Sequence, residues 1–141
     1  MRRPIAIAAA LAALAAAPAA PAASGGLSYQ GWTSQGEQIG FRVTKQGASR
    51  MRFTVITKCS NGDTVSFALK ALDTRADPVR RGRFTAVLDS AGAPKATVKG
   101  KLGPYFTGRG TITASGKGRG PNGEHLGTCR TERPVRWTAG P

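Results

Sequence analysis

The stretch RMRFTVITKCSNGDTVSFALK, from Arg50 to Lys70, contains the two features that decide the fold. Apolar and polar residues alternate on both sides of a central SNGD segment, and the apolar positions are Met51, Phe53 and Val55 before it and Val65, Phe67 and Leu69 after it. Alternation with a period of two is typical of a β-strand with one buried and one solvated face. The Asn61-Gly62 pair favours a tight hairpin with a type I′ turn, because both residues tolerate a positive φ.

The same alternation continues along the rest of the chain. Further strand patterns occur in QIGFRVT (38–44), RFTAVLD (83–89), KATVKGKL (95–102), GTITASG (110–116) and PVRWTA (134–139). Gly-, Asn- and Pro-containing turn segments separate these patterns, and no segment has a sustained helical spacing of apolar residues. The chain is therefore predicted to be all-β, an antiparallel meander of about eight strands with Phe53, Val55, Phe67 and Phe84 in the core.

A small closed barrel is the expected architecture, and a two-layer β-sandwich is the alternative. The barrel is preferred because glycines punctuate two successive strand patterns, at Gly100, Gly103, Gly108, Gly110 and Gly116. Glycines inside strands mark strong coiling or close backbone approach, as at barrel corners. In such a sheet the first and last strands would lie side by side.

The N-terminus has the pattern of a secretory signal peptide. Arg2 and Arg3 precede an apolar, alanine-rich segment, and small residues follow it. Ala20 and Ala22 form an A-x-A pattern, so we expect residues 1–22 to be a signal peptide and residues 23–141 to be a single domain. No second long apolar segment and no lipobox cysteine follow. The sequence thus predicts a secreted or cell-envelope associated protein without a transmembrane segment.

Cys59 and Cys129 are the two cysteines of the chain. In an exported domain, two cysteines most often form one disulfide. A zinc site would need about four ligands, and a cysteine nucleophile would need a base, for which His125 is the single histidine. We therefore expect a Cys59–Cys129 disulfide, with no metal and no cofactor.

Several segments resemble a type of small exported domain found in high-GC, actinobacterial-type bacteria. They are YQGWTSQG (29–36), RFTVITKCSNG (52–62), RRGRFTA (80–86), GRGTITASG (108–116), GTC (127–129) and VRWTA (135–139). The resemblance implies a disulfide-containing β domain and attaches no activity or functional residue to the chain.

Catalytic motifs are lacking in the sequence. The chain has seven carboxylates, most of them in predicted turns, and no pair has the spacing of an acid and base. His125 follows Glu124 in a glycine-rich turn, and we interpret it as a solvated turn residue. No G-x-S-x-G, H-E-x-x-H or Walker-type loop occurs. We therefore assign no catalytic residues.

Positive charge is the strongest remaining signal. The formal net charge is +14, and losing Arg2 and Arg3 with the leader would reduce it by two, to +12. A field of this sign attracts polyanions. Several cations take the polar positions of their predicted strands, where solvent is expected, and these are the candidate polyanion-binding residues: Arg42, Arg50, Arg52, Lys58, Lys95, Lys99 and Lys101.

Four aromatic residues bear on binding. Trp32 and Tyr29 have opposite parity, so one of the two should face outward. Tyr105 and Phe106 follow Pro104 and are expected to plug one end of the core; the alternative is a binding rim there.

The sequence favours an exported, noncatalytic binding or envelope-associated protein that docks to anionic cell-envelope polymers or lipid headgroups. Specific nucleic-acid recognition is not expected, because aromatic residues are scarce and lie mostly at core positions. The alternatives are a β-barrel that carries a small ligand, and a small secreted hydrolase or enzyme inhibitor. The sequence leaves the oligomeric state open.

Overall fold

The computed structural model describes residues 25–71, 75–89 and 92–141, and its regular structure is almost entirely β. The strands are β1 (Leu27–Thr33), β2 (Gln38–Thr44), β3 (Gly47–Cys59), β4 (Thr64–Lys70), β5 (Arg83–Leu88), β6 (Lys95–Leu102), β7 (Gly108–Arg119), β8 (His125–Arg130) and β9 (Val135–Gly140). A single-turn 3₁₀ helix, η1 (Pro104–Phe106), connects β6 and β7. The predicted signal peptide, residues 1–22, lies outside the described residues.

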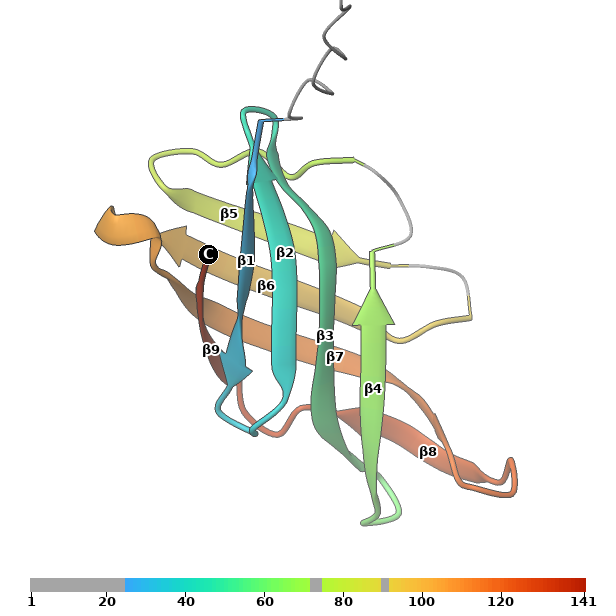
Figure 1. Ribbon diagram of the computed structural model, residues 1–141. Coiled ribbons are helices and arrows are strands. Elements are labelled where there is room, and N and C mark those ends of the chain that lie inside the picture. Colours follow the sequence, from blue (N-terminus) through green and yellow to red (C-terminus); the bar gives the residue numbers. More distant parts are fainter. Residues whose placement is uncertain (1–24, 72–74, 90–91) are drawn as a thin grey trace, which may run out of the picture.

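All strand pairs are antiparallel and belong to one sheet of nine strands, with the order β4-β3-β2-β1-β9-β7-β6-β5. Strand β8 pairs with both β3 and β7, and this pairing joins the two halves of the sheet into a ring. Figure 1 shows strands β1 to β4 lying along a common axis, antiparallel to one another, with β5 to β7 crossing behind them. The expected all-β antiparallel fold is confirmed, and β1 and β9, the first and last strands, are neighbours.

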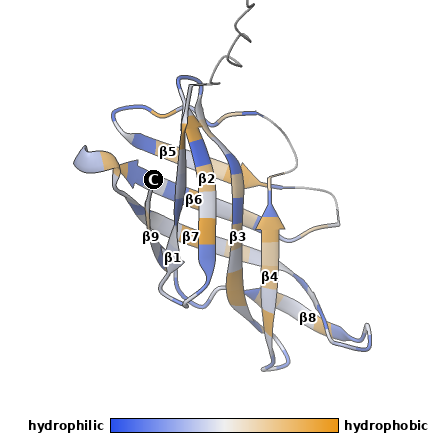
Figure 2. Cartoon of the chain, in the orientation of Figure 1, coloured by the Kyte–Doolittle hydropathy of each residue, from blue (hydrophilic) through white to orange (hydrophobic). Residues whose placement is uncertain are grey.

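Alternation along each strand separates a buried face from a solvated one. In β3 and β4 the side chains of Phe53, Val55 and Phe67 are buried, while Arg52 is exposed. Figure 2 shows the corresponding change between hydrophobic and hydrophilic residues along the strands. The predicted register is therefore correct, because a shift by one residue would place every charge in the core.

Aromatic rings fill the centre of the core. Tyr29 stacks on Phe41 at a centroid distance of 5.0 Å, and Trp137 meets Phe41 edge-on at 5.4 Å. Gly110 has no side chain, and a Cβ there would collide with the Lys99 carbonyl and the Trp137 indole. The interior glycines thus mark close approach, as expected. A core occupied in this way by side chains does not favour the ligand-carrying alternative.

The β3–β4 hairpin occurs where the Asn61-Gly62 pair predicted it, but the turn type is different. The Gly62 amide donates to the Cys59 carbonyl (2.9 Å), and the Cys59 amide donates to the Asp63 carbonyl (2.8 Å). Only Gly62 has a positive φ, at 93°. This geometry is a three-residue loop, a type I turn followed by a glycine bulge, rather than a type I′ turn. The Asn61 amide group also donates to the Asp63 carboxylate (2.8 Å) and stabilises the loop.

The turns at SQGE (34–37) and PNGE (121–124) repeat this hydrogen-bond pattern. The Gly36 amide donates to the Thr33 carbonyl (3.0 Å), and the Gly123 amide donates to the Gly120 carbonyl (3.0 Å). Both glycines have a φ of 79°. In each of the three turns an acidic residue follows the glycine, which places these carboxylates outside the strands.

The predicted disulfide joins Cys59 of β3 to Cys129 of β8. The two residues are direct partners in the β3–β8 pairing. A Cβ at Gly118 of β7 would collide with the Cys129 sulfur, so this glycine provides room for the disulfide. The cross-link therefore lies where β8 bridges the two halves of the ring.

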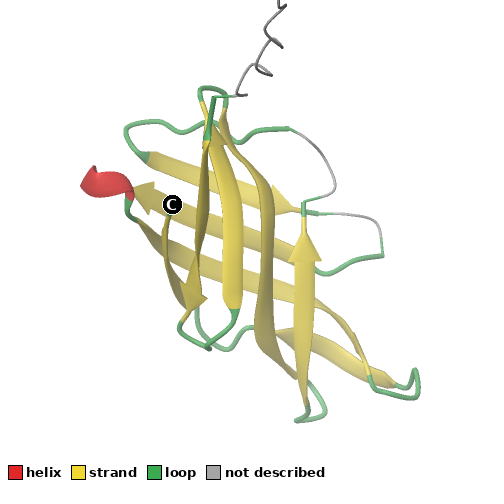
Figure 3. Ribbon diagram, in the orientation of Figure 1, coloured by secondary structure: helices red, strands yellow, loops and turns green. Residues whose placement is uncertain are grey.

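The η1 turn projects beyond the end of β6 (Figure 3). Tyr105 is 91% exposed and Phe106 is also exposed, so the expectation that these rings plug the core is wrong. Their φ angles are 61° and 57°, in the left-handed region that is uncommon for aromatic residues. In this conformation both rings are held at the surface; Leu102, at the end of β6, packs against the core instead.

Candidate polyanion-binding face

The two signs of charge are separated between strands and connections. None of the nine described strands contains an aspartate or glutamate. The acidic residues within the described ranges lie in the connecting segments, at Glu37, Asp63, Asp77, Asp89, Glu124 and Glu132. Every strand except β1 contains at least one arginine, lysine or histidine, so the outward faces of the strands are positive or neutral.

Three cations lie directly opposite one another across β5, β6 and β7. Arg83 is the register partner of Lys101, and Lys101 is the register partner of Arg109. All three side chains are exposed. Directly opposed residues on neighbouring strands have Cα atoms about 4.5–5.5 Å apart, and like charges at such positions destabilise the sheet. The fold therefore maintains a concentration of positive charge at a cost in stability.

Two further cations lie in the neighbouring row on the same face of the sheet. Lys99 and Arg136 are both register partners of Thr111, from β6 and β9 respectively. Both are exposed, and neither forms an ion pair with an acidic residue among those described. We call Arg83, Lys99, Lys101, Arg109 and Arg136 the basic cluster. Its members come from four strands that are adjacent in the sheet, of which β5, β6 and β7 are consecutive in the chain and β9 is separated from them by β8.

The seven cations predicted to bind polyanions fall on two different parts of the surface. Arg42, Arg50, Arg52 and Lys58 lie on β2 and β3, and Lys95, Lys99 and Lys101 lie on β6. Six of the seven are exposed as expected, and Arg42 is partly buried. They do not form one continuous patch, because β6 belongs to the half of the sheet that crosses behind β2 and β3 (Figure 1).

Two of the seven already have acidic neighbours. The Lys58 ammonium lies 3.5 Å from a Glu132 carboxylate oxygen, and the Lys95 ammonium lies 3.2 Å from Asp89. Both pairs are at the surface, where ion pairs contribute little to stability. They nevertheless reduce the local positive potential, so on β6 Lys99 and Lys101 are better placed than Lys95 to attract an anion.

Sequence reasoning missed three members of the basic cluster: Arg83, Arg109 and Arg136. Each occupies an outward position next to a buried or glycine neighbour, so strand parity could have identified them individually. Their assembly into one cluster depends on strand order. The insertion of β9 between β1 and β7, which brings Arg136 to Thr111, has no local sequence signal.

A groove of about 650 Å³ adjoins the cluster. Lys101 and Arg109 line one side of it, Thr138 lines its middle and Trp32 its far side. Trp32 is 58% exposed and Tyr29 is buried, so Trp32 is the outward-facing member of that pair. The groove combines positive charge, a hydroxyl group and an aromatic surface, which suits an extended anionic ligand.

The structure places His125 at an exposed position at the start of β8. The adjacent Glu124 carboxylate accepts a hydrogen bond from the Asn122 backbone amide (2.9 Å), so this carboxylate stabilises its own turn. Among residues 25–71, 75–89 and 92–141, no three His, Cys, Asp or Glu side chains are grouped as a metal site would require.

Comparison with known protein families, with curated proteins and with solved structures finds no match to this chain. No helix within the described ranges is long and apolar enough to cross a membrane. The disulfide is consistent with an extracellular location.

Proposed function

We propose that this protein is an exported, noncatalytic binding protein that docks to anionic polymers or lipid headgroups of the cell envelope through its basic cluster. The observation that carries the proposal is the row Arg83–Lys101–Arg109, in which like charges oppose one another directly and no described acidic residue pairs with them. An anionic ligand would neutralise this repulsion, so binding and stabilisation would be linked.

The filled aromatic core supports a surface-binding role over the carriage of a small ligand inside the sheet. The separation of charge supports it as well, because acidic residues are confined to turns and do not interrupt the outward faces of the strands. Attraction of this kind is long-ranged, tolerant of ligand sequence and sensitive to salt.

The proposal is tested with the triple variant Arg83→Gln, Lys101→Gln and Arg109→Gln. We expect it to bind inorganic polyphosphate and acidic-lipid vesicles at least about tenfold more weakly than the unchanged protein, because the opposed row supplies the attraction. The same variant should have a higher melting temperature without ligand, because the repulsion within the row is removed.

The matched control removes three exposed cations outside the cluster, by Lys45→Gln, Arg75→Gln and Arg133→Gln. It has the same net charge as the test variant. If both variants lose affinity equally, the binding reflects net charge alone and the basic cluster is not the site. Retention on neutral vesicles equal to that on acidic vesicles would also contradict the proposal.

A further inference from the structure

Trp32 lies within the face of the sheet, flanked by strands on both sides. Its register partners are Gln38 on β2 and Thr138 on β9. More than half of its surface is exposed, although it is one of the largest apolar side chains of the domain. A tryptophan exposed on a sheet face in this way offers an aromatic platform to a ligand.

Grooves lie on both sides of this platform, and Trp32 lines each of them. The groove toward β7 and β6 ends at Arg109 and Lys101 of the basic cluster. The second groove, of about 470 Å³, runs over β2, β3 and β4 and ends at Arg52 and Lys70. Trp32 is therefore the midpoint of a continuous track with cations at both ends.

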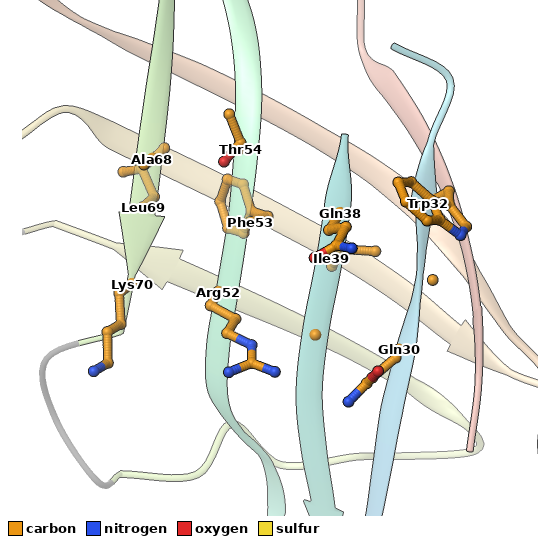
Figure 4. A pocket seen from close by; sticks show the side chains of 12 residues that line it. Gln30, Trp32, Gln38, Ile39, Arg52, Phe53, Thr54, Ala68, Leu69 and Lys70 are labelled. Carbon is orange, nitrogen blue, oxygen red and sulfur yellow. The ribbon is translucent and has the colours of Figure 1, made fainter. Parts of the chain in front are cut away.

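Figure 4 shows the second groove, with Arg52 and Lys70 side by side and Gln30 at the other end of the same row. Gly40 lies between Gln30 and Arg52 in the pairing, and its missing side chain leaves room for the Arg52 side chain in the floor of the groove. A Cβ at Gly40 would lie 3.0 Å from the Arg52 guanidinium Nε, so the arginine leans across this gap.

We propose that this track binds an acidic polysaccharide, with one sugar ring stacked on Trp32 and carboxylate or phosphate groups of the chain at the two cationic ends. Neutral polar groups lie close to the platform, namely the amides of Gln30 and Gln38 and the hydroxyls of Thr54 and Thr138. Amides and hydroxyls both donate and accept hydrogen bonds, as sugar hydroxyls require. The track crosses seven strands from β6 to β4, which corresponds to roughly 29 Å at the usual strand spacing and requires several linked sugar rings.

This inference rests on the proposed function and names the class of its ligand. A polysaccharide fits better than a single-stranded nucleic acid, because nucleic-acid channels stack successive bases on several aromatic side chains. Here each groove has Trp32 as its one exposed aromatic residue, and the exposed rings of Tyr105 and Phe106 line neither groove.

The test compares oligogalacturonate, an acidic sugar polymer, with inorganic polyphosphate, which carries charge without sugar rings. Trp32→Ala should weaken oligogalacturonate binding by about tenfold, as the loss of one stacked ring would, and leave polyphosphate binding unchanged. Tyr105→Ala is the matched control and should change neither. Melting temperatures establish that each variant is folded. Trp32→Gln replaces the same ring by a polar side chain and should have the same effect on binding as Trp32→Ala.

Fluorescence gives an independent readout, because the other tryptophan, Trp137, is only 2% exposed. Oligogalacturonate should protect the exposed Trp32 from quenching by acrylamide, and the protection should vanish in Trp32→Ala. Equal loss of affinity for both polymers, or no loss for either, would overturn the polysaccharide assignment but leave the basic cluster in place. Tighter, Trp32-dependent binding of a single-stranded oligonucleotide would overturn it in favour of nucleic acid. If neither polymer binds in a salt-sensitive way, the proposed function fails as well.

Discussion

At the scale of single residues, Phe53 shows how much the buried face contributes. Its ring is buried on β3 and lies opposite Ile39 of β2 and Leu69 of β4. We expect Phe53→Ala to lower the free energy of unfolding by roughly 3–5 kcal/mol, because the removed ring leaves a cavity. Denaturant unfolding measures this loss. Val87→Ala, at an exposed position on β5, should change stability by less than about 0.5 kcal/mol.

Gly110 gives a second prediction at this scale. A methyl group there would be forced against the Lys99 carbonyl and the Trp137 indole. Gly110→Ala should therefore cost roughly 1–3 kcal/mol through overpacking. Gly140→Ala is the control, since that glycine is also in a strand but has open space around its Cβ position. Equal thermal stability of the two variants would show that β7 can move away from Trp137 without strain.

At the scale of elements, β8 is held to β7 by pairing over five positions, but its link to β3 depends on the disulfide. It pairs with β3 over Lys58 and Cys59 only, whereas β3 and β4 pair over seven positions from Arg52 to Lys58. The cysteines are 70 residues apart, a separation for which loop-closure entropy amounts to about 4 kcal/mol.

Replacing both cysteines, by Cys59→Ala and Cys129→Ala, should lower the free energy of unfolding by roughly 2–5 kcal/mol. Because the bond anchors β8, hydrogen exchange should also increase more in β8 than in β4. Uniform exchange across the two strands would contradict this local role. Intact-mass analysis of the unchanged protein should detect no free thiol.

Strand β6 contains three lysines of the same parity that we expect to behave differently. Lys95→Gln should weaken polyphosphate binding less than Lys101→Gln, because Asp89 already neutralises Lys95 at 3.2 Å. Lys101 instead lies between Arg83 and Arg109. Replacing Lys95, Lys99 and Lys101 together should weaken binding without lowering the free energy of unfolding appreciably, since all three are exposed. An effect of Lys95→Gln as large as that of Lys101→Gln would mean that the Asp89 pair does not persist in solution.

At the scale of the whole molecule, positive charge on the strands and negative charge in the turns should make binding depend on ionic strength. Exposed charges are screened over about 10 Å at 0.1 M salt. We expect the affinity for acidic-lipid vesicles to fall steeply between low and physiological salt, as measured by cosedimentation. Retention that does not change with salt would indicate an apolar contact, for which the exposed η1 turn would be the first candidate.

Local pattern was sufficient to predict much of this architecture. The alternation in RMRFTVITKC and TVSFALK identified which side chains are buried, because a strand places successive residues on opposite faces whatever its partners are. The Asn61-Gly62 pair located a hairpin, since glycine readily takes the positive φ that the loop requires. The cysteine pair followed from its number and the expected compartment. From parity alone, one of Tyr29 and Trp32 was expected to face outward, and the structure shows that it is Trp32.

The departure from a simple meander, at β8 and β9, was decided by tertiary structure alone. The pairing of β9 with β1 was expected, but nothing near Gly108 or Val135 in the sequence states that β9 also pairs with β7, or that β8 pairs with both β3 and β7. Such pairings form between backbone groups that are the same in every strand, so their choice depends on how all the buried faces pack together. That choice brings Arg136 of β9 beside Arg109, while the meander of β5, β6 and β7 itself sets Arg83, Lys101 and Arg109 in one row. The amino-acid composition determined that the protein is strongly basic. The strand register determined at which positions its cations face one another across the sheet.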